Sequence, residues 1–221
     1  MELAARLGIA PGMTAVIGGG GKTTLLRVLG EELANRSRVL LCTSTKILPF
    51  PGLPLAETEG ELYRLRETNR LLCAGQKLLD GEKLTAPPIP FSQLAELFDY
   101  VLVEADGAAR RPLKAHADHE PVIPPESHQT ICVVGASGFG RPIGEAAHRP
   151  EQFARLAGAS LQDAATAERV AAVLRAEALH RRVYINQVES PADVAEAKRL
   201  AALLDGPVLA GSLQRGEYFQ C

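Results

Sequence analysis

The sequence lacks an excess of either charge. It holds 24 Lys and Arg against 26 Asp and Glu, for a formal net charge of −2, and no cluster of basic residues stands out. It therefore gives no sign of a nucleic acid or an anionic membrane as a main partner. No apolar run approaches the roughly 18 residues of a membrane helix. The first residues also lack the charged segment and long apolar stretch of a secretory signal. We expect a cytoplasmic protein with no membrane or nucleic-acid partner.

Cysteine is scarce, and its spacing does not suit the common cysteine-based sites. The sequence has four cysteines and no Cys-x-x-Cys pair, which excludes the usual zinc and thioredoxin-type sites. Cys42, Cys73 and Cys132 each lie in an apolar run and are expected to behave as small buried hydrophobic residues. A selenium- or sulfur-handling role for Cys42 is a separate hypothesis, because Cys42 ends a strand-like run near the glycine-rich loop described below.

Short apolar runs alternate with segments of helical spacing along the chain. This alternation predicts an α/β fold of the P-loop NTPase type, with a largely parallel sheet flanked by helices. With 46% hydrophobic residues, residues 1–221 can bury the core of a single domain. Residues 47–90 are less regular, and we interpret them as an insertion after the second strand, beside the sheet edge, with a possible hairpin at Asp80-Gly81. The expected strands are 39–42, 100–103, 131–134, 183–185 and 207–210, and the expected helices are 22–35, 59–66, 92–98, 166–179 and 192–204.

Residues 16–24 read Val-Ile-Gly-Gly-Gly-Gly-Lys-Thr-Thr and join an apolar run to a segment of helical spacing. This is the context of a phosphate-binding loop. Gly18, Gly19, Gly20 and Gly21 let backbone N–H groups turn toward an anion, and the following helix adds its N-terminus. Lys22 would reach the β- and γ-phosphates and Thr23 would bind Mg²⁺. Thr24 is also expected to bind the nucleotide. We expect ATP or GTP as the cofactor, with Mg²⁺.

The loop is similar to the Gly-x-Gly-Gly-x-Gly-Lys-Thr-Thr variant of the MinD and dethiobiotin-synthetase class. Val16 replaces the first glycine of that pattern, and Ile17 replaces its signature lysine. The alternative is an ordinary glycine-rich turn with a solvated Lys22.

Two carboxylates and a glycine follow the apolar run at 100–103. Glu104 and Asp106 come where that strand should end, and ligands bind at the carboxyl ends of strands in doubly wound sheets. Either carboxylate is expected to bind Mg²⁺ directly or through water, and the N–H of Gly107 to contact the γ-phosphate. The alternative is an acidic turn after a buried strand.

Asn186, Gln187 and Glu189 resemble a degenerate Asn-Lys-x-Asp motif, which reads guanine in many G-proteins. Gln187 stands for the lysine of that motif and Glu189 for its aspartate. Asn186 is expected either to fix the glycine-rich loop or to bind the base. The identity of the base stays open, and an ordinary Asn at a strand end is the alternative.

Residues 106–128 concentrate basic and histidine side chains after the two carboxylates. Arg110, Arg111, Lys114, His116 and His119 lie in this segment, where a phosphoryl substrate, a second phosphate contact or a partner protein would be handled. His116, Asp118 and His119 could also form part of a metal site. A solvated connection anchored by prolines is the alternative.

Together these segments resemble the YqeC family, whose members are described as accessory proteins of selenium-dependent molybdenum hydroxylases. The resemblance implies nucleotide-dependent maturation of such hydroxylases, with the glycine-rich loop, Glu104, Asp106 and the 110–119 segment as functional residues. It rests on residues 18–24, 43–46, 103–116, 120–124, 134–135, 148–151 and 184–187.

Three functions follow from these motifs. The first is a weak Mg²⁺-dependent nucleoside triphosphatase, with Lys22, Glu104, Asp106 and Arg110 as catalytic residues. A partner or a homodimer contact would supply an arginine, for which Arg110 and Arg111 are candidates. The second is a small-molecule kinase or ATP-dependent ligase of the dethiobiotin-synthetase type. The third is a non-catalytic scaffold that a bound nucleotide orders for docking on a client enzyme.

Overall fold

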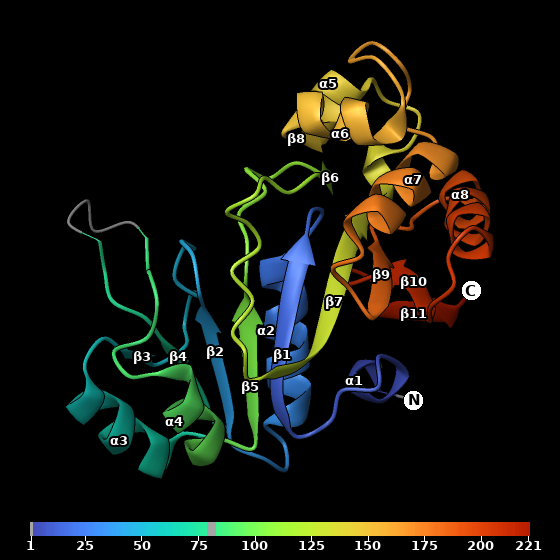
Figure 1. Ribbon diagram of the computed structural model, residues 1–221. Coiled ribbons are helices and arrows are strands. Elements are labelled where there is room, and N and C mark those ends of the chain that lie inside the picture. The colour runs from blue at the N-terminus through green and yellow to red at the C-terminus, as the bar shows by residue number, and fades with distance from the viewer. Residues whose placement is uncertain (1, 79–82) are drawn as a thin grey trace. The chain divides into compact units, whose positions relative to one another are not determined.

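The computed structural model describes residues 2–78 and 83–221, which form two compact units (Figure 1). The first unit comprises the residues up to 16 together with 23–107 and 122–129, and the second comprises 17–22, 108–121 and 130–221. The boundary between Lys22 and Thr23 therefore falls inside the glycine-rich motif. The hairpin expected at Asp80-Gly81 lies outside the described residues.

The first unit is built on parallel strands in the order β1-β5-β2-β4-β3. Strands β2 and β5 are apolar along nearly their whole length, because helices cover both faces of the sheet. Helix α2 covers one face: its Gly30 lies against Leu41 and Leu71. Helices α3 and α4 lie on the other face (Figure 1), where Leu62 and Leu94 join the core. The elements are α1 (Leu3–Arg6), β1 (Gly12–Gly18), α2 (Lys22–Leu33), β2 (Val39–Thr43), β3 (Leu55–Ala56), α3 (Glu59–Thr68), β4 (Leu71–Ala74), α4 (Phe91–Leu97) and β5 (Tyr100–Glu104).

The segment 47–90 contributes two strands to this sheet. Strand β4 pairs with β2, and the two-residue β3 pairs with β4. Thr58 caps the start of helix α3: its side chain and that of Glu61 form a capping box, which satisfies N–H groups that the first helical turn leaves without acceptors. The segment we interpreted as an insertion beside the sheet edge therefore forms that edge within the first unit.

In the second unit the strand order is β7-β9-β10-β11. Strands β7, β9 and β10 are parallel, and β11 closes the edge as an antiparallel hairpin with β10. Helix α8 begins at a capping box formed by Ser190 and Asp193. The elements are β6 (Leu113–Lys114), β7 (Ser127–Gly135), a short 3₁₀ turn (Ala136–Gly138), α5 (Ile143–Ala146), β8 (Ala147–His148), α6 (Pro150–Ala157), α7 (Ala167–Glu177), β9 (Arg182–Asn186), α8 (Pro191–Ala202), β10 (Val208–Ser212) and β11 (Glu217–Gln220).

The α/β class and the largely parallel, helix-flanked sheet are confirmed in both units. Each expected strand and helix is present, with ends that differ by a few residues. Strand β11 and the small sheet of β6 and β8 were not expected. No helix within residues 2–78 and 83–221 is long and apolar enough to span a membrane. The single domain over 1–221 stays a prediction.

Candidate functional site

The glycine-rich loop lies between the end of β1 at Gly18 and the start of α2 at Lys22. The Lys22 residue is only 5% exposed, because its side chain folds back over the loop and Nζ donates a hydrogen bond of 2.7 Å to the carbonyl oxygen of Gly18. Strand, glycine loop, lysine and helix follow one another as a phosphate-binding loop requires.

Two loop amides already have partners within the second unit. The N–H of Gly19 donates to the Val133 carbonyl at 2.9 Å, and the N–H of Gly20 donates to the Arg111 carbonyl at 3.1 Å. An anion could use both amides only if these bonds opened. The first turn of α2 offers further N–H groups, since they have no acceptor inside the helix. The phosphate contacts of Gly18, Gly19, Gly20 and Gly21 stay predictions.

Gly20→Ala is expected to destabilise the protein, because the loop has no room for a side chain there. Gly20 has φ of +76°, and a Cβ would lie 2.4 Å from the Cα of Gly135. We expect a loss of about 2–4 kcal/mol in the free energy of unfolding, from left-handed strain and overlap with backbone atoms. Urea denaturation measures it. Gly60→Ala is the control, since a Cβ there meets nothing within 4 Å; equal stability of the two variants would contradict the crowding of the loop.

Asn186 links the glycine-rich loop to the residue that follows β10. Its Nδ2 donates to the Gly20 carbonyl at 2.8 Å, and its Oδ1 accepts from the N–H of Leu213 at 3.1 Å. A Cβ on Gly21 would lie 2.5 Å from the same Nδ2. Of the two roles expected for Asn186, the geometry favours fixing the loop over binding a base.

The rest of the degenerate guanine motif also holds local structure. Gln187 Oε1 accepts from Ser137 Oγ at 2.7 Å. Glu189 Oε1 accepts from Ser212 Oγ at 2.9 Å, and the Glu189 carbonyl accepts from Arg215 at 3.0 Å. The carboxylate that stands at the aspartate position of the motif therefore supports the turn between β10 and β11. The identity of the base stays open.

Thr23 and Glu104 meet in the first unit. Glu104 is the last residue of β5, in register with Val16 of β1, and is 6% exposed. Thr23 Oγ1 donates to Glu104 Oε2 at 2.7 Å. Asp106, two residues further on, is fully buried. A hydroxyl with a neighbouring carboxylate suits Mg²⁺, which prefers oxygen ligands and takes the rest from water and phosphates.

The strand ends around Glu104 are tied together by backbone contacts. Thr43 Oγ1 donates to the Glu104 carbonyl at 2.7 Å, and the Ser44 N–H donates to the same oxygen at 3.2 Å. These bonds hold β2 and β5 at the position where Glu104 presents its carboxylate. Gly107 is not required by packing, because a Cβ there would meet nothing within 4 Å; its contact with a γ-phosphate stays a prediction.

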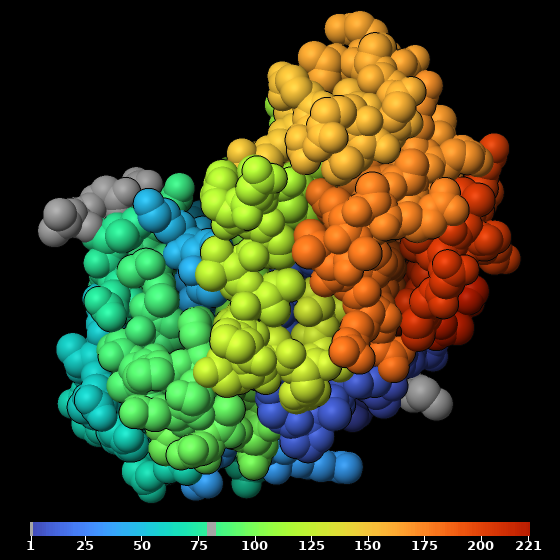
Figure 2. Space-filling model, in the orientation of Figure 1, coloured from blue at the N-terminus to red at the C-terminus, as the bar shows by residue number. Residues whose placement is uncertain are grey.

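The segment 108–121 belongs to the second unit; its residues 109–111 and 118–119 are exposed, whereas residues 112–116 are buried. Figure 2 shows yellow-green atoms of this part of the chain on the drawn face. The ammonium of Lys114 is fully buried and forms a 2.8 Å ion pair with Glu120. Arg149 adds a 3.2 Å ion pair to the same carboxylate. Burial raises the pKa of Glu120, but hydrogen bonds and charges from Lys114 and Arg149 outweigh it and hold the pKa below its usual value. Lys114 therefore has a structural role in this segment.

His116 has a structural partner as well. Glu177 accepts from the His116 backbone N–H at 2.6 Å and lies 2.8 Å from its Nδ1. Within residues 2–78 and 83–221, no three His, Cys, Asp or Glu side chains are grouped to hold a metal ion. The metal site suggested by His116, Asp118 and His119 is thus not formed.

The two neighbouring arginines of this segment differ in their surroundings. The Arg111 guanidinium donates to the Glu145 carbonyl. Arg110 is exposed and has φ of +60°, a conformation that costs a non-glycine residue energy. Of the two arginines considered for catalysis, Arg110 has the freer side chain. Its catalytic role stays a prediction.

Cys42 is poorly suited to nucleophilic chemistry. It is completely buried in β2. Burial, with a smaller contribution from Cys73, raises the pKa of the Cys42 thiol well above its usual value. Because the thiolate is the nucleophile, these surroundings disfavour the selenium- or sulfur-handling hypothesis.

Comparisons with known proteins identify relatives of this chain. A family described as "YqeC protein" matches residues 14–151. A protein of Escherichia coli (strain K12), "Uncharacterized protein YqeC", is 31% identical over 172 residues, covering 67% of this chain. The chain spans 61% of that relative's length.

One solved structure shows a distant likeness. It is the signal recognition particle 54 kDa protein of Aeropyrum pernix K1 in complex with GDP, at 16% identity and a TM-score of 0.45. The match covers 96% of this chain and 44% of that one. At this level of similarity it supports no inference about the present chain.

Proposed function

The chain belongs to the YqeC family, and we propose that it binds a nucleoside triphosphate with Mg²⁺ and hydrolyses it slowly. We further propose that it acts in the cytoplasm as an accessory factor in the maturation of selenium- or molybdenum-dependent hydroxylases. The observation that carries nucleotide binding is Lys22 held over a glycine loop at a strand–helix junction. The accessory role rests on the family resemblance.

Different residues would bind the phosphates and the magnesium ion. Lys22 would exchange the Gly18 carbonyl for the β- and γ-phosphates, while the first turn of α2 adds N–H groups and a positive dipole. Thr23 and Glu104 would hold a magnesium ion, with Asp106 as a further proposed ligand, and the charge of the ion would neutralise the phosphoryl oxygens. Glu104 would orient the Thr23 hydroxyl, which it already contacts at 2.7 Å.

We expect slow turnover by the chain alone, because a partner would have to supply the arginine that completes the site. A transferring phosphoryl group needs further positive charge, and loss of an arginine finger can cost on the order of 10³-fold in rate. Arg110 is exposed, so in a homodimer it could reach the phosphates held by a second copy of the chain, and a client enzyme could supply an arginine of its own. Either contact would raise the rate.

A nucleotide-gated scaffold is the second candidate. The bonds from Gly19 and Gly20 to the Val133 and Arg111 carbonyls favour it. If phosphates take these amides, the 108–121 segment loses a contact with the loop and its order changes. Hydrogen exchange of this segment with and without nucleotide tests the idea, and unchanged protection would exclude it.

Glu104→Gln tests the magnesium half of the proposal. We expect affinity for ATP or GTP in the presence of Mg²⁺ to fall by about tenfold or more, because the amide loses the negative charge that attracts the cation. Affinity measured in EDTA should hardly change. Isothermal calorimetry with both nucleotides gives these values and identifies the base.

Glu96→Gln is the matched control, since Glu96 is exposed on α4. Equal magnesium dependence in both variants would remove Glu104 from the metal site. Turnover with nucleotide alone supports a hydrolase. Turnover only with a small acceptor supports a kinase or ligase, and tight binding without turnover supports the scaffold.

A further inference from the structure

A hollow of about 360 Å³ opens in the first unit. All nine residues that line it are polar or charged, and four of them are arginines: Arg36, Arg38, Arg66 and Arg70. Its volume falls in the range of small-molecule sites. Because the lining offers no apolar side chain, the hollow suits a ligand recognised by charge and hydrogen bonding.

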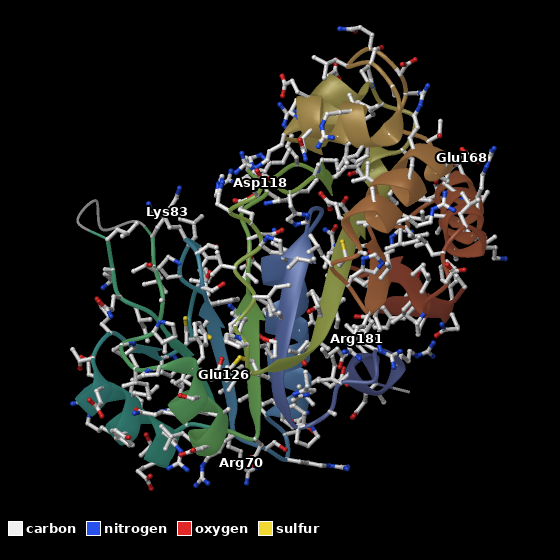
Figure 3. All side chains as sticks on the ribbon, in the orientation of Figure 1. Arg70, Lys83, Asp118, Glu126, Glu168 and Arg181 are labelled. Atoms are coloured by element: carbon white, nitrogen blue, oxygen red, sulfur yellow. The ribbon has the colours of Figure 1, made fainter. Side chains whose placement is uncertain are left out.

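The hollow lies at the amino-terminal ends of the strands. Residues 36–38 lead from α2 into β2, residues 66–70 comprise the end of α3 and its connection to β4, and Asp99 precedes β5. Figure 3 labels Arg70 at this end of the first unit. Thr43 and Glu104 lie at the opposite ends of β2 and β5. At roughly 3.3 Å per residue, five-residue strands separate the two ends by more than 10 Å, so the hollow is separate from the magnesium site proposed at Thr23 and Glu104.

The two carboxylates of the hollow already have partners. Glu67 Oε1 lies 3.3 Å from the Arg66 guanidinium, and Asp99 Oδ2 accepts from the backbone N–H of Arg38 at 2.7 Å. Within the described ranges, the guanidinium groups of Arg36, Arg38 and Arg70 form no ion pair with a carboxylate. With four arginines against the two carboxylates, the lining of the hollow carries a formal net charge of +2.

Two of the arginines are held in place. Arg66 Nε donates to the Leu97 carbonyl at 2.7 Å, and Arg70 donates to the Asn35 carbonyl at 2.9 Å. Each bond uses one N–H group of a guanidinium that has five. The remaining donors keep a fixed orientation, which lowers the entropy lost when a ligand binds.

We propose that this hollow is a second anion site, which binds the phosphate groups of a compact polyanion such as a diphosphate, free or attached to a nucleoside. Guanidinium groups bind phosphate oxygens through two parallel hydrogen bonds. Four of them around a small concavity match a ligand with several closely spaced negative charges better than a single carboxylate. The site goes beyond nucleotide binding at the glycine-rich loop and does not depend on it.

Calorimetric titration of the Lys22→Ala protein with inorganic pyrophosphate tests the site, since this background removes the lysine of the glycine-rich loop. In it, Arg36→Gln combined with Arg38→Gln should weaken pyrophosphate binding by about 100-fold, roughly tenfold for each lost charge-assisted contact. Both arginines are exposed, so the variant should fold. Arg64→Gln, an exposed position of α3 outside the hollow, should leave the affinity within about twofold.

Saturable binding that the double variant loses and Arg64→Gln keeps would support the site. Absence of saturable binding to Lys22→Ala, or equal affinity in the double variant, would overturn it. ADP and GDP titrated in the same background separate the two sources: tighter binding than pyrophosphate means a nucleoside-linked diphosphate, and equal binding means the free group. These outcomes do not test the proposed function. That proposal fails only if the wild-type protein binds no nucleoside triphosphate at the glycine-rich loop.

Discussion

Lys22→Ala is expected to lower the affinity for a nucleoside triphosphate with Mg²⁺ by about 100-fold or more. A charge-assisted hydrogen bond contributes about 1.5–3 kcal/mol, and the lysine of a phosphate-binding loop makes such contacts with two phosphates. At about 1.4 kcal/mol per tenfold change, their loss gives two or more decades in Kd. Calorimetry with ATP and GTP measures the effect.

Stability separates this effect from misfolding. In the protein without nucleotide, the substitution removes the bond from Nζ to the Gly18 carbonyl, which contributes about 1 kcal/mol. The thermal midpoint should therefore move by only a few degrees. Lys198→Ala on α8, an exposed position, is the control and should bind nucleotide as the wild type does. Unchanged affinity in a folded Lys22→Ala protein would mean that the lysine serves only the loop.

The strands and helices could be predicted because their sequence patterns are local. Strands β2 and β5 are almost uninterrupted Val and Leu runs, as a sheet covered on both faces requires. Strand β3 has only two residues, too few for a periodic pattern. Strand β11 begins and ends with exposed polar residues, so it lacked the apolar signal by which the other strands were found.

The glycine-rich loop could be located for the same reason, since its residues are consecutive. The hydrogen bonds that the loop makes could not be predicted from the sequence. The carbonyl that receives the Gly20 N–H is at Arg111, and the amide that supports the loop is at Asn186. Hydrogen bonds between positions so far apart in the chain follow from the fold and leave no spacing in the sequence.

The basic segment after Glu104 shows the same limit. Its residue types suggested a phosphoryl or metal site, yet Lys114 pairs with Glu120 and His116 with Glu177, 61 positions away. A nearby pair such as Lys114 and Glu120 could have been suspected from its opposite charges. The burial of the Lys114 ammonium could not have been predicted from the sequence, and it is this burial that gives the pair its structural role.

Glu120→Ala is expected to destabilise the protein strongly, because it removes one partner of a largely buried ion pair in the second unit. Removing one partner of a buried pair costs about 3–5 kcal/mol, because the other charge is left in a poorly solvated place. The Lys114 side chain is fully buried, whereas that of Glu120 is 14% exposed, so we expect the lower end, about 3 kcal/mol, by urea denaturation at pH 7.

Glu168→Ala is the matched control. Glu168, which Figure 3 labels, pairs with Arg199, and the two side chains are 46% and 62% exposed. Solvent screens such a pair, so its loss should cost less than about 1 kcal/mol. Equal effects of the two substitutions would show that burial of Lys114 adds nothing to the energy of its pair.

The pH dependence tests whether charge is the cause. The pKa of Glu120 is below its usual value in the folded protein, through Lys114 and Arg149 acting against burial. A lowered carboxyl pKa contributes stability that is fully present above the pKa of the unfolded chain, about 4.3, and is lost as pH falls through the folded value. The difference in unfolding free energy between wild type and Glu120→Ala should therefore be constant from pH 6 to pH 8 and shrink below about pH 4.5. A difference that persists unchanged into acid would assign it to packing.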